Sequence, residues 1–136
     1  SDLTKDALGF YGKNLGLTFQ IVDDTLDYNS NLNLFGKKIG NDFFEGKITL
    51  PIILLYQNAN DVEKIKINEF FTKKNRDEKN FKEILEKIKK YNIISQCYKK
   101  AEHFIYLASN SLSIFDNSDE KRILEQLTSF SLERSF

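Results

Sequence analysis

Glycine and proline are distributed unevenly along this chain, and their distribution constrains the fold more than any other feature of the sequence. All six glycines lie within the first 46 of the 136 residues, and the single proline is Pro51. After Pro51 the chain contains neither of the residues that most often interrupt a helix, while apolar residues recur every three or four positions. This pattern predicts an all-α fold.

The same periodicity predicts where the helices lie. The clearest apolar stripe runs through residues 2–28, with Ser1 or Asp2 as its cap. Residues 29–48 break the pattern and are expected to form a loop. Thr49 is expected to cap a helix that is apolar nearly all round, which predicts a central, buried position. Further helices are expected at 61–74, 77–91, 92–114 and 118–134.

The composition argues against several classes of function. The 20 basic residues are balanced by 20 acidic ones, which does not favour nucleic-acid binding. No stretch is long and apolar enough to cross a membrane, and the first residues lack the pattern of a secretory leader. The single cysteine, Cys97, rules out an internal disulfide framework and suits a reducing compartment, so we expect a cytoplasmic protein. Cys97 is expected to be a small core residue, and the only histidine, His103, an ordinary, partly exposed side chain rather than a metal ligand.

Three aspartates, Asp23, Asp24 and Asp27, lie close together at the end of the first predicted helix. Asp23 and Asp27 are four residues apart, so they share a helix face, and two carboxylates about 6 Å apart repel by about 3 kcal/mol. A divalent cation would remove this repulsion, and carboxylate oxygens suit Mg²⁺. A run of acidic residues is as often a solvated helix face, and that alternative stays open here.

Glycines continue the acidic face towards the start of the helix. Gly12, Gly16 and Gln20 precede Asp23 at spacings of three or four residues. A glycine inside a helix costs about 1 kcal/mol relative to alanine. We therefore expect another helix or a ligand tail to approach the backbone along this face.

Lysines follow the aspartates within about twenty residues. Lys37, Lys38 and Lys47 lie in a segment whose glycines would let it fold back over the helix end. A lysine-rich loop alone is most often plain surface. Together with an acidic cluster, however, it describes a diphosphate site, in which carboxylates hold Mg²⁺, Mg²⁺ binds phosphate oxygens, and ammonium groups neutralise the remaining charge.

These motifs resemble those of a known family, the trans-type polyprenyl diphosphate synthases. The stretch FQIVDDTLD resembles the family's second aspartate-rich motif, and GKKIGNDFFEGKITLP is similar to the segment that follows that motif. The resemblance covers about residues 7–56, and the final FSLERSF, with Arg134, is similar to the family's arginine-bearing tail. It implies that the chain is part of an isoprenoid-synthase helical bundle.

The resemblance also implies roles for individual residues. Asp23, Asp24 and Asp27 would form the second Mg²⁺ cluster, and Lys38 and Lys47 would contact the allylic diphosphate. Asp23 and Lys38 are the expected catalytic residues. The remaining substrate-binding residues would be a supporting carboxylate and two side chains that line the pocket, namely Asp42, Phe19 and Gln20. The implied reaction is condensation of an allylic diphosphate with isopentenyl diphosphate.

The chain departs from the family pattern because it lacks the first aspartate-rich motif and the basic isopentenyl diphosphate site. Residues 1–136 are therefore expected to be the C-terminal portion of a single synthase domain, inactive alone and completed by a missing N-terminal half or a partner chain. The full-length family enzyme is expected to be a homodimer. The ending EGKITLP resembles long-chain members, such as octaprenyl diphosphate synthase, that make quinone side chains. One alternative is a non-catalytic helical subunit or a truncated remnant. A terpene cyclase fragment is a third option, but the paired lysines fit chain elongation better.

Overall fold

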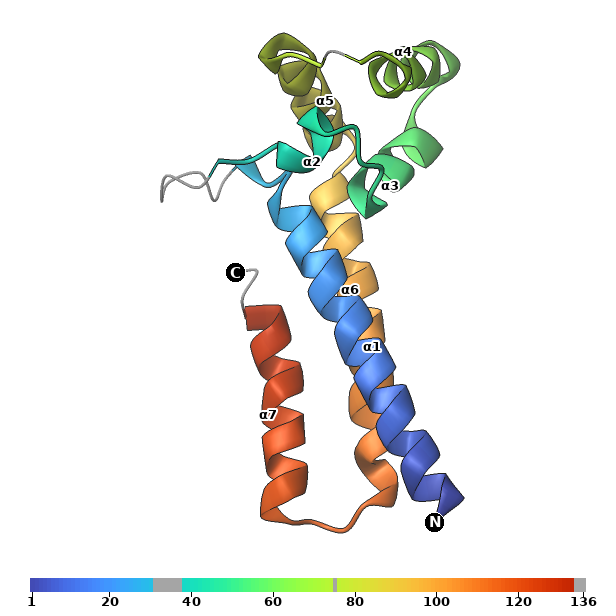
Figure 1. Ribbon diagram of the computed structural model, residues 1–136, viewed down its shortest axis with the longest axis vertical. Helices are drawn as coiled ribbons and strands as arrows, with labels where there is room; N and C mark the ends of the chain where they lie inside the picture. The colour runs from blue at the N-terminus through green and yellow to red at the C-terminus, as the bar shows by residue number, and fades with distance from the viewer. Residues whose placement is uncertain (31–37, 75, 134–136) are drawn as a thin grey trace. The chain divides into compact units, whose positions relative to one another are not determined.

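The computed structural model describes residues 1–30, 38–74 and 76–133, and it contains helices and no strands in those ranges. The all-α prediction is therefore confirmed for the described part of the chain. The elements in chain order are α1 (Asp2–Leu26), α2 (Asn41–Phe44), α3 (Leu50–Asn58), α4 (Asp61–Thr72), α5 (Glu78–Lys90), α6 (Ile93–Ser111), the short 3₁₀ helix η2 (Leu112–Ile114) and α7 (Asp119–Glu133), and Figure 1 labels the α-helices. No helix among the described residues is long and apolar enough to span a membrane.

The helices divide between two compact units. Unit 1 comprises Ser1–Val22 and Tyr98–Phe136, and unit 2 comprises Asp23–Cys97. Helices α1 and α6 each contribute one end to each unit. The expectation that the chain is part of one synthase domain stays a prediction.

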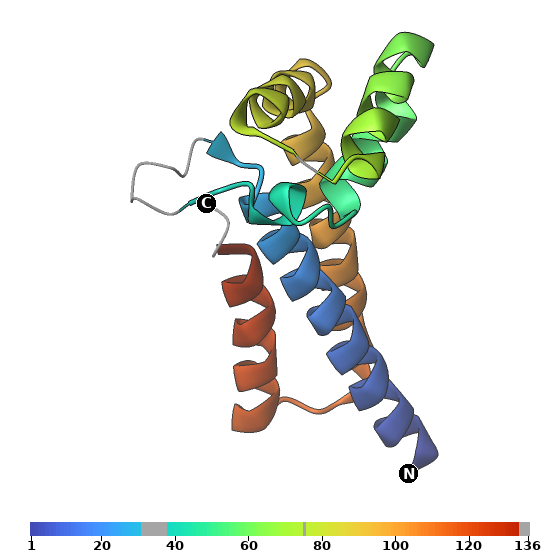
Figure 2. The same cartoon turned by 45° about the horizontal axis from the view of Figure 1, so that its top comes forward.

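In unit 1 the first part of α1, the second part of α6 and α7 lie side by side (Figures 1 and 2). Their shared core is an apolar cluster in which Tyr11 packs with Ala108 and Leu112, and the partly buried residues around it are Leu15, Phe115 and Leu124. The Tyr11 hydroxyl donates a hydrogen bond of 2.6 Å to the Leu124 carbonyl oxygen, so its polar end is satisfied. This bond ties α1 to α7.

The core of unit 2 is built around an aromatic side chain from α2. Phe43 is completely buried, and its ring centroid lies 5.5 Å from those of Phe71 and Phe81 and 6.2 Å from that of Phe70. Aromatic pairs at these separations contribute roughly 0.5–1.5 kcal/mol each beyond the area that they bury. Phe43 therefore anchors the short α2 helix to α4 and α5. The sequence pattern predicted a loop at Asn41–Phe44, and one turn of helix is found instead.

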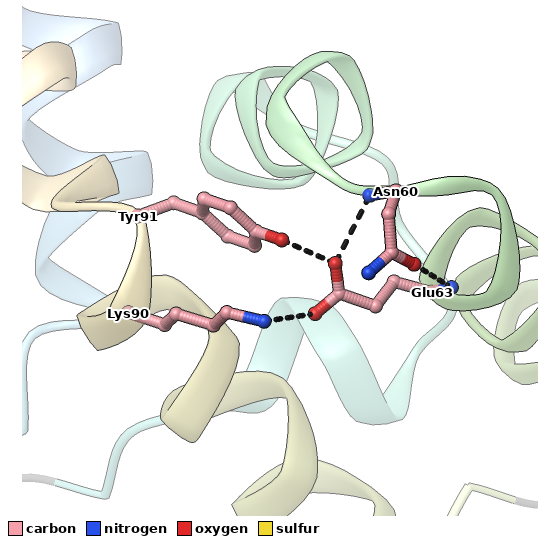
Figure 3. A network of polar contacts seen from close by, with 4 residues as sticks. All are labelled: Asn60, Glu63, Lys90 and Tyr91. Atoms are coloured by element: carbon pink, nitrogen blue, oxygen red, sulfur yellow. Dashed lines mark hydrogen bonds and ion pairs between the residues drawn. The ribbon is translucent and has the colours of Figure 1, made fainter.

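A carboxylate near the start of α4 joins that helix to the turn between α5 and α6 (Figure 3). Glu63 forms a capping box with Asn60, accepts a hydrogen bond from the Tyr91 hydroxyl, and pairs with Lys90 at 3.1 Å. The hydrogen bond from Tyr91, followed by that from the Asn60 amide, lowers the pKa of Glu63 to about 2. This network fixes the start of α4 within unit 2.

Helix α3 differs in part from its prediction. Thr49 occupies the N-cap position as expected, but its side chain makes no capping hydrogen bond. Ile52, Leu54 and Leu55 are buried, as expected for a central helix, whereas 43% of Ile53 and 45% of Tyr56 is exposed. The prediction that α3 is buried all round is therefore wrong for one face. That face borders an apolar groove of about 310 Å³, which is lined by Ile48, Ile52, Ile53, Tyr56, Gln57, Ile67, Asn68 and Phe71.

Candidate functional site

The three aspartates lie at the end of α1 and just beyond it. Asp23 and Asp24 belong to the last turns of α1, which ends at Leu26, and Asp27 follows immediately. Asp23 is exposed, whereas Asp24 and Asp27 are partly buried. The amides of Tyr28 and Asn29 bond back to carbonyls three residues earlier, which tightens and ends the helix there rather than at the predicted residue 28.

Asp27 holds the segment that carries α2. One carboxylate oxygen of Asp27 accepts a 2.7 Å hydrogen bond from the Asp42 amide, and the Asp27 carbonyl accepts a 2.8 Å bond from the Gly40 amide. Amides in the first turn of a helix have no partner within the helix, so the Asp27 carboxylate satisfies one of them. Gly40 adopts φ +92, a left-handed conformation that favours glycine. Asp27 therefore fixes the start of α2, fifteen residues further along the chain, by accepting this hydrogen bond.

The path of the chain through α2 brings Asp42 and Lys47 towards the aspartates at the end of α1. Burial raises the pKa of Asp24, the Asp42 charge raises it further, and Lys47 opposes the shift. Burial also raises the pKa of Asp42, with Asp27 adding to the effect and Lys47 again opposing it. Asp24, Asp27, Asp42 and Lys47 are thus close enough to feel one another's charge. Carboxylates outnumber the ammonium in this group, so it is suited to bind a cation.

Lys47 has a defined backbone position at this site. Its amide donates a 2.8 Å hydrogen bond to the Asp42 carbonyl, and its side chain is exposed. Lys38 is also exposed, and its approach to the aspartates stays a prediction. Lys37 and Arg134, singled out from the sequence, lie outside the described residues.

Phe19 and Gln20 lie on α1 about one turn before Asp23, in unit 1. Phe19 is partly buried and Gln20 is exposed, and their contact with substrate stays a prediction. A Cβ atom built on Gly12 or Gly16 meets no other atom of the described chain within 4 Å. No helix of the described chain therefore approaches these two glycines that closely, and of the two predicted neighbours the ligand tail stays untested.

The arrangement of the acidic residues fits a metal shared with a ligand better than a closed protein cage. Within the described ranges, no three histidine, cysteine, aspartate or glutamate side chains converge tightly enough to hold an ion. One oxygen of Asp27 is already engaged by the Asp42 amide. Mg²⁺ commonly takes only one or two carboxylates and completes its coordination with waters and phosphate oxygens. The donor set at the end of α1 suits that mode of binding.

Two further residues hold the α2 segment in place. Phe43 was expected in the core, with a substrate contact left open because of its place in the basic segment, and Arg76 was not considered. The guanidinium of Arg76 donates to the Phe44 carbonyl at the end of α2, at 3.3 Å. Arg76 is one of three arginines in a chain that otherwise uses lysine, which is the one signal that could have drawn attention to it.

Neither Cys97 nor His103 was expected to take part in a functional site. Cys97 is completely buried, as predicted for a core residue. His103 is exposed, and its ring lies 5.6 Å from that of Phe104.

Comparison with known proteins identifies consistent relatives. The sequence model of the family described as polyprenyl synthetase matches residues 1–88. Octaprenyl diphosphate synthase of Haemophilus influenzae is 29% identical over 136 residues, which is 100% of this chain and 41% of that protein. A short chain isoprenyl diphosphate synthase of Methanothermobacter thermautotrophicus is 31% identical over 128 residues, covering 94% of this chain and 39% of that protein.

A solved structure agrees with these relatives. The polyprenyl synthase of Caulobacter crescentus, crystallised with calcium and isoprenyl diphosphate, matches with a TM-score of 0.86 and 31% identity. The match covers 100% of this chain and 42% of that one. The chain thus spans about two-fifths of the length of the relatives that it matches, and it corresponds to their C-terminal part.

Proposed function

Because the chain belongs to the polyprenyl synthetase family, we propose that it supplies the second aspartate-rich motif of a trans-prenyl diphosphate synthase. The proposed reaction joins isopentenyl diphosphate to an allylic diphosphate. The observation that carries this proposal is the folding of α2 onto the end of α1, since the hydrogen bond from the Asp42 amide to Asp27 gathers Asp24, Asp42 and Lys47 into one charged group. A motif that was only solvated surface would not require this arrangement.

In the proposed site each side chain has a distinct role. Asp23 and Asp24 present carboxylate oxygens for Mg²⁺, and Asp27 offers the oxygen that the Asp42 amide does not use. Mg²⁺, when bound, stabilises the negative charge that develops on the departing diphosphate. Lys47 and Lys38 provide ammonium groups for the phosphate oxygens. Asp42 supports Lys47 through its charge, and Phe19 and Gln20 line the path of the prenyl tail.

The excess of carboxylates supports cation binding at this site. Both Asp24 and Asp42 have a raised pKa because they are partly buried and face other acidic groups, with only Lys47 acting in the opposite direction. A bound divalent cation would favour the ionised form of both groups. The fold therefore retains a repulsive arrangement that a ligand can relieve.

We further propose that the substrate chain is long. The ending EGKITLP resembles long-chain enzymes, and one relative is an octaprenyl diphosphate synthase, although another is a short chain enzyme. The product would then be a precursor of quinone side chains. The first aspartate-rich motif and the isopentenyl diphosphate site would come from an N-terminal half or a partner chain, and the assembled enzyme would be a homodimer.

The proposal is tested by Mg²⁺-dependent binding of a non-hydrolysable allylic diphosphate analogue to the 136-residue chain. We expect the variant Asp23→Ala/Asp24→Ala to lose most of this binding. The matched control is Asp2→Ala/Asp6→Ala, because it removes two exposed carboxylates from the opposite end of the same helix. Equal binding by the wild type and the Asp23/Asp24 variant would remove the support for a metal site.

The alternative function is a non-catalytic helical subunit or a truncated remnant. The exposed apolar face of α3, with Ile53 and Tyr56, favours a chain that packs against further protein in either case. The two functions differ in what happens when an N-terminal half from a relative is added. We expect the isolated chain to be inactive, and prenyl transfer that appears only in the mixture would support the enzymatic role.

A further inference from the structure

The guanidinium group of Arg76 joins the ends of two helices in unit 2. One terminal nitrogen, Nη1, donates to the carbonyls of Phe70 and Lys73 at the end of α4, at 3.2 and 2.5 Å. The other, Nη2, donates to the Phe44 carbonyl at the end of α2, at 3.3 Å. Carbonyls in the last turn of a helix lack partners within the helix and carry the negative end of its dipole, so they attract a cation.

The same guanidinium lies against Gly46, the residue that turns the chain after α2. A Cβ atom added to Gly46 would come within 2.7 Å of Nη2 and 2.9 Å of Cζ of Arg76. Gly46 also has φ +74, in the left-handed region that side chains rarely adopt. The left-handed backbone therefore favours glycine at this turn, and the absence of a side chain there leaves room for the Arg76 guanidinium.

Lys47 follows directly after this turn. Its amide bonds to the Asp42 carbonyl, and the Gly46 amide bonds to the Phe43 carbonyl at 2.9 Å, so the turn and α2 form one hydrogen-bonded unit. This unit is attached at its start, where Asp27 accepts from the Asp42 amide. It is attached at its end by Arg76.

We propose that Arg76 is a positioning residue for the diphosphate site, because it fixes the turn at Gly46 and so presents Lys47 next to Asp24 and Asp42. The inference rests on the proposed function, and it adds a residue on the connection between α4 and α5 that never touches the substrate. An arginine suits this task better than a lysine. Its planar fork holds acceptors from two helices at once, whereas an ammonium is a compact point charge.

Binding of inorganic diphosphate in the presence of Mg²⁺ to the 136-residue chain tests the inference. We expect Arg76→Gln to bind diphosphate about tenfold more weakly. This is about the loss expected when one hydrogen bond between the Lys47 ammonium and a phosphate oxygen is no longer made. The matched control is Lys74→Gln, which removes the same charge from an exposed residue two positions away. Arg76→Lys keeps the charge without the fork, and we expect it to bind nearly as weakly as Arg76→Gln.

A double-mutant cycle separates positioning from a general loss of stability. If Arg76 acts through Lys47, then Arg76→Gln causes no further loss of binding in a Lys47→Ala background. If the affinity of the double variant falls by the product of the two single-variant factors, the inference is overturned, because Arg76 would then act independently of Lys47. Thermal unfolding of each variant identifies any that fails to fold, and Arg76→Lys replaces Arg76→Gln in the cycle in that case.

Amide hydrogen exchange gives a second readout that requires no ligand. We expect the amides of Gly46 and Lys47 to exchange at least severalfold faster in Arg76→Gln than in wild type, and at the wild-type rate in Lys74→Gln. Unchanged exchange in Arg76→Gln would overturn the inference whatever the binding result.

The outcomes for the two proposals are distinguishable. If the wild-type chain binds no diphosphate with Mg²⁺, the proposed function loses its support and the role of Arg76 in it falls too. If binding is lost in Asp23→Ala/Asp24→Ala but retained in Arg76→Gln, the proposed function stands and only the role of Arg76 is refuted.

Discussion

Unit 1 is held together by apolar contacts between long helices, whereas unit 2 is held together around a short segment whose polar groups are fixed by distant residues. In unit 1, Tyr11, Ala108 and Leu112 form a continuous apolar cluster across three elements. In unit 2, α2 has only four residues and depends on Phe43, Asp27 and Arg76 for its position. All the charged groups of the candidate diphosphate site except Lys38 are tied to that short segment or to the helix end beside it.

The difference shows that the residues of the Tyr11 cluster in unit 1 serve packing alone, whereas those that hold α2 in unit 2 also position the charged groups of the candidate site. A helix of four residues cannot be stable alone, because few hydrogen bonds offset the cost of ordering it. Its conformation therefore depends on tertiary contacts, and each contact also places a group of the site. Substitutions that loosen α2 should consequently change stability and ligand binding together, whereas those in the apolar cluster around Tyr11 should change stability alone.

The largest effect is expected at Phe43. Replacing this completely buried residue by alanine should cost about 3–5 kcal/mol, because it removes the ring around which Phe70, Phe71 and Phe81 pack. The matched control is Phe10→Ala in unit 1, since 47% of Phe10 is exposed. Chemical denaturation gives the free energies of unfolding, and residue-resolved amide exchange shows which unit opens. Equal losses in the two variants would contradict the central position of Phe43.

The next largest effect separates two roles of Asp27. Asp27→Ala should cost about 1–2 kcal/mol, because it removes the acceptor for the Asp42 amide at the start of α2. Asp27→Asn retains an oxygen at the same place, so it should keep most of this stability while weakening Mg²⁺-dependent binding. Denaturation and binding titrations of both variants check this. A stability loss as large in Asp27→Asn as in Asp27→Ala would mean that the charge of Asp27, and not its hydrogen bond, holds α2.

Asp27 also shows how much of the site could be predicted from the sequence. The spacing of Asp23, Asp24 and Asp27 identified the acidic end of α1, because helical geometry is local. The bond from Asp27 to the Asp42 amide was not predictable, because it depends on the path of the chain through Gly40. Asp27 was therefore expected to be only a metal ligand.

The same distinction explains the helix predictions. The expected helices at 61–74 and 77–91 are found as Asp61–Thr72 and Glu78–Lys90, each beginning with a capping box that two residues three positions apart encode. The helix at Asn41–Phe44 is only about one turn long, so the apolar pattern cannot repeat within it and no periodicity could reveal it. Arg76 was overlooked for a related reason, since its acceptor Phe44 is thirty-two residues away.

Acid should affect unit 2 through two opposing groups of carboxylates. The pKa of Glu63 is lowered to about 2, so its network contributes fully above the ordinary glutamate pKa and is lost as the pH falls through about 2. The raised pKa values of Asp24 and Asp42 have the opposite effect on stability. Protonation of these two groups relieves repulsion as the pH falls below neutral, so it stabilises the fold. We therefore expect the stability of unit 2 to rise slightly on mild acidification and then to fall towards pH 2.

Glu63→Gln provides the control for this pH dependence. The variant should be less stable than wild type near neutral pH, and the difference should shrink as the pH approaches 2, where Glu63 itself becomes protonated. Residue-resolved amide exchange or circular dichroism across this range measures it. A difference between variant and wild type that does not change with pH would mean that the Tyr91 and Lys90 contacts do not depend on the charge of Glu63.

The smallest effect is expected in unit 1, at the hydrogen bond between Tyr11 and Leu124. Tyr11→Phe keeps the ring in the apolar cluster and removes only the hydroxyl, so it should cost about 1 kcal/mol. Tyr106→Phe on α6 is the matched control, because 64% of Tyr106 is exposed and its hydroxyl can bond to water in both states. Neither change should alter Mg²⁺-dependent binding of diphosphate. If Tyr11→Phe weakened that binding as Arg76→Gln is expected to do, packing in unit 1 would be coupled to the site in unit 2, and the separation between the two units would not hold.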